Sequence, residues 1–142
     1  MSAGYTFDVD PSRNYVRLRM HGFFTPEDLP AFIAARREAH VRLTCAANAH
    51  VTLNDIRELK IQSKEIVDGF SRMLGDSAYH ARRLAFVITP GLLRTQVMRA
   101  LAGRDDARCF ESKRNAEAWL FVPNIDMPIQ KLVGTVPLRM GA

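Results

Sequence analysis

The residues best suited to chemistry lie between positions 55 and 64. Asp55 supplies a carboxylate, Ser63 supplies a hydroxyl, and Arg57, Lys60 and Lys64 place three cations beside them. Such a group of cations favours a phosphate, an acidic protein surface or another anion. We therefore expect this segment to contact a protein partner or a ligand.

The segment forms a site only if the chain brings Asp55 close to Thr89, which follows a second apolar run and precedes Pro90-Gly91. In α/β proteins, ligands bind at the carboxyl ends of parallel strands, where helix N-termini favour anions. Both residues would then line one corner of a sheet. A simpler role for Asp55 stays open, because Asp is a preferred N-cap and can cap the following helix or turn.

Motifs of known catalytic sites are missing from the sequence. It has no glycine-rich phosphate loop, no dinucleotide fingerprint and no Gly-x-Ser-x-Gly elbow. The histidines and cysteines have no metal-ligand spacing; they are His21, His40, His50, His80, Cys45 and Cys109. We expect no enzyme, no cofactor and no metal. An enzyme would require polar groups converging on Asp55 and Thr89.

Composition indicates one folded domain. The 142 residues are 47% hydrophobic and carry a net charge of +5, spread along the chain rather than in blocks. No aromatic stripe interleaves with the arginines, so we expect no nucleic-acid partner. No apolar run reaches the ~20 residues of a membrane helix, and the N-terminus does not resemble a signal peptide. We expect a cytoplasmic protein without a transmembrane segment.

The elements that must position these residues begin with a hairpin. Tyr5–Val9 and Tyr15–Met20 alternate apolar and polar residues around the turn Asp10–Asn14, which predicts two antiparallel strands. Thr25 and Pro26 then mark the start of a helix that fades at residues 40–43.

Strand and helix patterns alternate through the rest of the chain. Strands are predicted at 49–53, ending at Asn54-Asp55, and at 84–88 and 107–110. Helices are predicted after a start between Glu58 and Ser63, from Leu93 to Gly103, and from Ser112 to Phe121. This alternation predicts an α/β fold: a mixed sheet of about five strands, the first antiparallel, with about four helices.

We assign residues 1–121 to this domain and 122–142 to a C-terminal apolar arm of the same domain. The arm is too apolar for a simple linker. We expect it to pack on its own domain or on a second copy, as a possible homodimer.

Laid out in this order, the hairpin, the strands and the final Glu117-Ala118-Trp119-Leu120 resemble the STAS domain, in particular the SpoIIAA-like group of small bacterial proteins. The resemblance covers roughly residues 5–121. It implies a non-enzymatic regulatory module that binds protein partners and sometimes a nucleotide or lipid. Asp55 matches the acid at the family's strand end. Ser63 falls on the first residue of its serine pair, and Lys64 falls on the serine that is phosphorylated.

The leading hypothesis is therefore a STAS-like module that recognises a protein partner. Its contact corner comprises Asp55, Arg57, Lys60, Ser63, Lys64 and Thr89. The alternative is a carrier or sensor of a small apolar or anionic ligand, such as a lipid or nucleotide. That ligand would enter between the first helix (Leu29, Phe32, Ile33) and the second (Phe70, Met73, Leu74).

Overall fold

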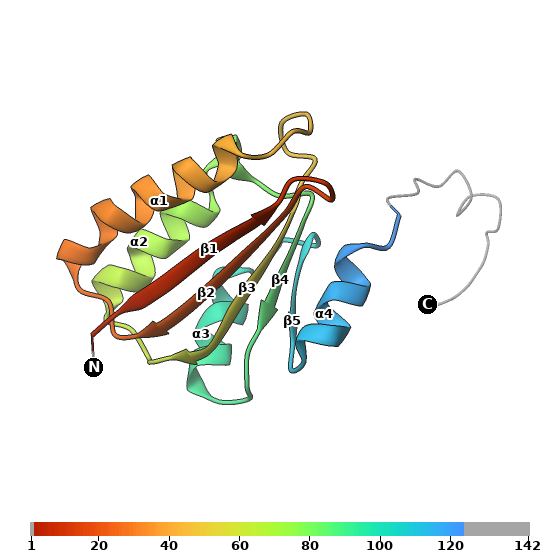
Figure 1. The fold of residues 1–142 in the computed structure, drawn as a ribbon. Helices are drawn as coiled ribbons and strands as arrows, with labels where there is room; N and C mark the ends of the chain where they lie inside the picture. Colours follow the sequence, from red (N-terminus) through yellow and green to blue (C-terminus); the bar gives the residue numbers. More distant parts are fainter. Residues whose placement is uncertain (1, 124–142) are drawn as a thin grey trace.

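Five strands form one mixed sheet in the computed structural model, which describes residues 2–123 (Figure 1). Their spatial order follows the chain order. Strand β1 pairs antiparallel with β2, and the remaining neighbours are parallel. The strands are β1 (Gly4–Asp10), β2 (Tyr15–Gly22), β3 (Val51–Leu59), β4 (Arg83–Val87) and β5 (Ala107–Phe110). The predicted fold class and the antiparallel first strand are confirmed.

Four α-helices cover the sheet: α1 (Leu29–Val41), α2 (Lys64–Leu74), α3 (Leu92–Ala100) and α4 (Lys113–Leu120). Two short 3-10 turns precede α1 and follow α2, at Pro26–Asp28 and Ser77–Tyr79. Helices α1 and α2 lie side by side (Figure 1), and Phe32 of one meets Phe70 of the other with ring centroids 5.8 Å apart.

The two faces of the sheet support separate apolar cores. We call the face toward α1, α2 and α3 the front face and the face toward α4 the back face. Because successive side chains of a strand point to opposite sides, β3 sends Thr52, Asn54 and Ile56 forward. Its residues Val51 and Leu53 pack against α4 on the back face.

Strand β3 is longer than predicted. Asn54-Asp55 does not end it, because β2 continues beside it after a register shift and pairs Gly22 with Leu59. Four further residues therefore stay extended. Helix α2 begins only at Lys64, where Ser63 is the N-cap and its hydroxyl accepts a hydrogen bond from the Ile66 amide.

Two side chains differ in burial from what their sequence positions indicate. Met98 has the helical spacing of a core residue but is 53% exposed, because it lies on the outer side of α3. His50 is a polar residue beside the start of β3 but is only 3% exposed, because its ring packs against His40 of α1.

None of the helices within residues 2–123 has both the length and the apolar character needed to cross a membrane. The predicted C-terminal arm and its role in a homodimer concern residues 122–142. Apart from the first two, these lie outside the described residues.

Candidate functional site

The acid of the predicted corner lies on the back face of the sheet. Asp55 is inside β3, four residues before its end, and Arg57 binds it through two side-chain hydrogen bonds of 3.0 and 2.7 Å. Burial raises the pKa of Asp55, but the hydrogen bonds and charge of Arg57 outweigh burial and hold that pKa below its ordinary value. Arg57 therefore already neutralises the carboxylate.

The other predicted corner residues lie in the loops after β3 and β4. Lys60 and Thr89 are exposed, and Ser63 caps α2. Lys64 forms a 3.0 Å ion pair with Asp68 one turn along the helix. The structure thus joins Asp55 to Arg57 within β3, and it places Lys60, Ser63, Lys64 and Thr89 at the carboxyl ends of the parallel strands.

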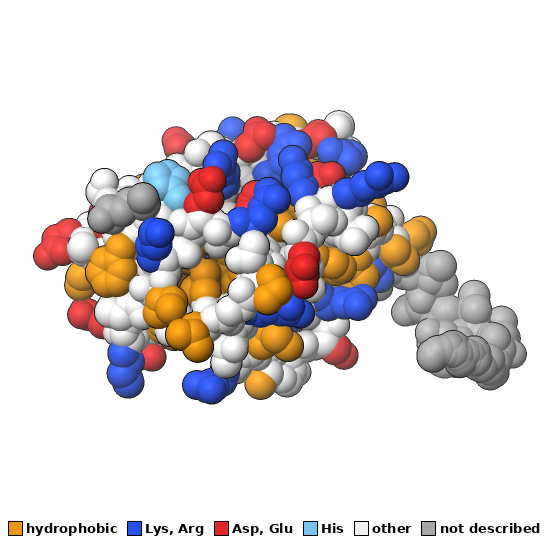
Figure 2. Space-filling model, turned by 90° about the horizontal axis from the view of Figure 1, so that it is seen from below, with side chains coloured by type: hydrophobic (Ala, Val, Ile, Leu, Met, Phe, Trp, Pro, Cys, Tyr) orange, Lys and Arg blue, Asp and Glu red, His pale blue; other side chains and the backbone are white. Residues whose placement is uncertain are grey.

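Apolar side chains are also exposed at this end of the sheet. Phe23 follows β2 directly, Ile61 lies two residues after the end of β3, and Leu92 is the first residue of α3 after β4. Viewed from below, the molecule presents hydrophobic side chains between Lys and Arg side chains (Figure 2). The predicted corner is therefore a mixed apolar and basic surface rather than a purely charged one.

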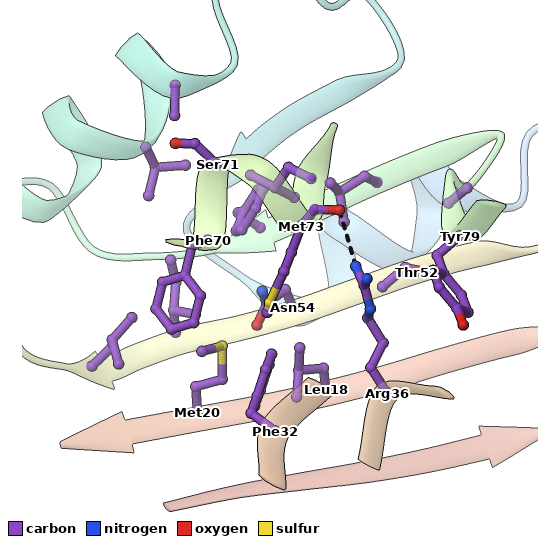
Figure 3. Close-up of a pocket in the computed structure, with 18 of the residues that line it drawn as sticks. Leu18, Met20, Phe32, Arg36, Thr52, Asn54, Phe70, Ser71, Met73 and Tyr79 are labelled. Atoms are coloured by element: carbon purple, nitrogen blue, oxygen red, sulfur yellow. Dashed lines mark hydrogen bonds between the residues drawn. The ribbon is translucent and has the colours of Figure 1, made fainter. Parts of the chain in front are cut away.

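A cavity of about 160 Å³ lies between the front face and helices α1, α2 and α3. Most of its wall is apolar; Figure 3 shows Leu18 and Met20 extending from the sheet toward Phe32 of α1 and Phe70 of α2. The main apolar side chains in this wall are Leu18, Met20, Phe32, Phe70, Met73 and Phe86.

Asn54 interrupts this apolar wall in the middle of the sheet. Leu18 of β2 and Phe86 of β4 are its partners in register on either side. It points from β3 into the space beneath α2 (Figure 3). Its Oδ1 is buried and has no hydrogen-bond partner among residues 2–123, and the same holds for Oε1 of Gln96, which lines the cavity from α3.

Gln62 is a buried carboxamide whose hydrogen bonds are made within the protein. Its oxygen accepts from the Phe24 amide at 2.9 Å, and its nitrogen donates to the carbonyls of Gly22 and Lys60. These bonds join the loop after β2 to the loop after β3. Gln62 therefore has a structural role that Asn54 and Gln96 lack.

Two arginines that line the cavity, Arg36 and Arg104, each lie beside a carboxylate. Nε of Arg36 is buried without a hydrogen-bond partner among residues 2–123. Arg36 donates to the Met73 carbonyl at 2.9 Å, lies 3.5 Å from a carboxylate oxygen of Asp76, and stacks 4.4 Å from the Tyr79 ring centroid. The bond to Met73 is drawn in Figure 3. Burial lowers the pKa of Arg36, and the negative charge of Asp76 acts in the opposite direction.

Arg104 is paired with Asp106. Its Nε donates to Asp106 at 2.9 Å, and its Nη1 donates to the Leu74 carbonyl at 3.3 Å. His80 contacts the other carboxylate oxygen of Asp106 at 2.6 Å. Because each arginine faces a carboxylate, the part of the cavity that they line is close to electrically neutral.

His40 and His50 form an edge-to-face pair beside this part of the cavity, with ring centroids 4.9 Å apart. Burial, reinforced by the positive potential of His40 and His80, lowers the pKa of His50 to about 4. Burial also lowers the pKa of His40. Both rings are therefore neutral at pH 7. Within the described part of the chain, no cluster of His, Cys, Asp and Glu could hold a metal ion.

Comparison with known proteins identifies the fold. No protein-family model and no curated protein matches the sequence. The structure is similar to that of an uncharacterised DUF3478-family protein with a SpoIIAA-like fold from Shewanella loihica PV-4, with a TM-score of 0.65 and 22% identity. The match covers 83% of this chain and 94% of the other. The fold is SpoIIAA-like.

Sequence reasoning located part of the front-face cavity. The predicted entry residues Phe32, Phe70, Met73 and Leu74 do line it. Leu29 and Ile33 instead line an outer groove between α1 and α2. Sequence reasoning missed the polar residues of the wall, Asn54, Gln96, Arg36 and Arg104. The position of Asn54 could have been predicted from the alternation in residues 51–56. If Val51 and Leu53 are buried on one face of the strand, Asn54 must lie on the other face, beside Ile56.

Proposed function

We propose that this chain is a non-enzymatic binding module that holds a small, largely apolar molecule in the front-face cavity. The observation that carries the proposal is the apolar cavity of about 160 Å³ with the Asn54 carboxamide in its wall. A chain evolved only for stability would fill such a space with side chains, since protein interiors are close-packed.

The energetics support an occupant. At about 24 cal/mol per Å³, an empty volume of this size forfeits on the order of 4 kcal/mol of packing. That is a large share of the ~5–15 kcal/mol by which a typical domain is stable. A ligand that fills the space recovers dispersion contacts and removes its own apolar surface from water.

Native mass spectrometry of the freshly purified protein, paired with a denatured run, tests this proposal. We expect extra mass that disappears on denaturation, or uptake of toluene by the empty protein with a rise in melting temperature. Val97→Phe, in the cavity wall, should abolish uptake, whereas the matched change Val41→Phe, at an exposed site on α1, should preserve it. A clean mass together with no toluene uptake by the folded protein would overturn the proposal.

Recognition of a protein partner, our leading hypothesis from sequence, is the second candidate. It is supported by the exposed Phe23, Ile61 and Leu92 beside Lys60 and Lys64 at the carboxyl ends of the parallel strands. Apolar side chains within a basic rim suit a partner with an acidic rim around an apolar centre.

Charge reversal tests the partner hypothesis. Lys60→Glu with Lys64→Glu should weaken any specifically captured partner at least tenfold. Lys113→Glu with Arg114→Glu, on exposed positions of α4, is the matched control. Equal capture by both double variants and by the parent would rule out this surface as the contact site. Asp55→Ala should have little effect, because Arg57 already neutralises that carboxylate.

A further inference from the structure

The position of Asn54 in the sheet indicates what its carboxamide is for. Across the five strands, its row in register is otherwise made of apolar residues and one cysteine: Phe7, Leu18, Phe86 and Cys109. The Asn54 side chain as a whole is half-buried, and within it the carboxamide oxygen is buried without a hydrogen-bond partner among residues 2–123. Leaving the carboxamide oxygen buried without a partner costs about 1–3 kcal/mol.

A bound molecule can supply the missing partner. A carboxamide has two donor hydrogens and an acceptor oxygen, and a half turn about its last torsion exchanges the two ends. Asn54 can therefore accept from a hydroxyl or N–H group of a ligand, or donate to a carbonyl. Gln96 provides a second carboxamide from α3 in the same cavity wall.

The charges around the cavity argue against an ionised ligand. The guanidinium groups of Arg36 and Arg104 already face Asp76 and Asp106. A carboxylate or phosphate entering this cavity would lose its hydration and would have to displace one of those pairs. Burying a charge without a new partner is far more costly than burying a neutral polar group.

The size of the cavity limits the ligand further. An engineered apolar cavity of about 150 Å³ in another protein accommodates benzene. The volume of about 160 Å³ here therefore fits a single six-membered ring with one small substituent. Phe32, Phe70 and Phe86 in the wall can pack edge-to-face against such a ring.

We infer that the ligand is a compact, uncharged molecule of about one ring, whose single hydroxyl, amide or carbonyl group pairs with Asn54. This inference rests on the proposed function and specifies its ligand class. Phenol is the simplest probe with these features. Toluene matches its size without the hydroxyl, benzoate adds a charge, and 1-decanol carries the hydroxyl on a long chain.

Isothermal titration and ligand-observed NMR on the full-length chain at pH 7 test the inference. We expect phenol to bind about 5–10-fold more tightly than toluene, which is the ratio given by one net hydrogen bond. Benzoate should bind at least tenfold more weakly than phenol, and so should 1-decanol. In the Asn54→Leu variant, the affinity for phenol should fall about tenfold and the affinity for toluene should not change. The matched control Asn115→Leu, at an exposed position on α4, should retain the parent ranking.

The parent ranking remains informative even if Asn54→Leu fails to fold. Equal binding of phenol and toluene would overturn the role of Asn54, and tighter binding of benzoate would overturn the uncharged ligand. Tighter binding of 1-decanol would overturn the size limit. In each of these three cases the cavity still binds an apolar molecule and the proposed function stands. If none of the four probes binds the folded parent, both the inference and the proposed function fail.

Discussion

The two faces of the sheet share five strands but are packed differently. On the back face, Val51 and Leu53 meet Ala116 and Leu120 of α4, and each of these side chains is at most 2% exposed. On the front face, three helices border a partly open cavity of about 160 Å³. Side-chain size explains the difference. Ala85 and Ala116 let α4 approach closely, whereas Phe32, Phe70 and Met73 hold α1 and α2 away from the strands.

Polarity divides the faces in the same way in the first half of β3. There the back-facing residues Val51 and Leu53 are apolar, while the front-facing Thr52 and Asn54, and the preceding His50 beside α1, are polar. Beyond this segment, the back face of β3 is also charged. In a protein selected only for stability, the face that three helices cover would be expected to carry the apolar residues. Natural proteins depart from local consistency mainly at functional sites. The front face is therefore where binding is expected, and the back face is where stability is expected.

Matched truncations test this division with the largest expected effect. Leu53→Ala on the back face should lower the free energy of unfolding by about 3–5 kcal/mol, because it opens a void in a filled core. Leu84→Ala on the front face should cost about 2–3 kcal/mol, because Leu84 already borders the cavity. Both side chains are buried, at 2% and 7% exposure, and urea unfolding measures both losses.

Toluene binding distinguishes the same two variants, Leu53→Ala and Leu84→Ala. Leu84→Ala enlarges the cavity and should bind toluene or a larger arene at least as tightly as the parent. Leu53→Ala should leave toluene affinity unchanged. Equal losses of stability together with unchanged binding in both variants would mean that the faces do not differ in packing.

The sequence predicted buried residues on both faces but not the cavity of the front face. Period-two alternation and helical spacing indicate which residues avoid water, and such residues occur on both faces of the sheet. The order of the elements was predicted from these patterns. The same signal cannot separate a filled core from a hollow one. Whether Phe70 and Met73 close a space or border it depends on the helix-to-sheet distance, which no local pattern encodes.

The end of β3 was predicted wrongly from its local turn residues. Asn54-Asp55 has the composition of a strand end, yet pairing with β2 extends β3 to Leu59. Tertiary pairing overrode a local preference, as it commonly does in sheets. This affects the candidate site: Asp55, predicted for the corner, lies on the back face, and Asn54, predicted at the end of a strand, lies within β3 in the cavity wall.

Acid should destabilise the front face selectively through His50. The pKa of His50 is about 4 in the folded protein, against ~6.5 in the unfolded chain, so between these values the unfolded state binds more protons. Stability is complete above about pH 7 and falls as pH drops through 6.5 toward 4, by on the order of 3 kcal/mol. His40, whose pKa burial also lowers, adds in the same direction.

Urea unfolding between pH 7.5 and 4.5 measures this slope. His50→Phe should flatten it by removing the buried imidazole. The matched change His21→Phe, at a partly exposed site on β2, should leave it unchanged. An identical slope in the parent and in His50→Phe would show that carboxylates, rather than the front-face histidines, set the acid sensitivity.

The smallest effects separate two carboxamides, the buried Gln62 and the half-buried Asn54, whose oxygen atom is buried. Gln62→Leu leaves the Phe24 amide and the Gly22 and Lys60 carbonyls without their partner, and should cost about 1–3 kcal/mol. Asn54→Leu should instead stabilise the ligand-free protein by up to about 1 kcal/mol, because it replaces a desolvated polar group with one that packs. Urea unfolding of the ligand-free proteins measures both changes.

Because the two substitutions should change the free energy of unfolding in opposite directions, they separate a residue that stabilises the fold from one that binds a ligand. A residue retained for folding loses stability when it is replaced, as Gln62 should. A residue retained for a ligand gains stability and loses affinity, as Asn54 should for phenol. If Asn54→Leu destabilised the ligand-free protein as much as Gln62→Leu does, Asn54 would be a structural residue. The front face would then owe its polar atoms to folding rather than to a bound molecule.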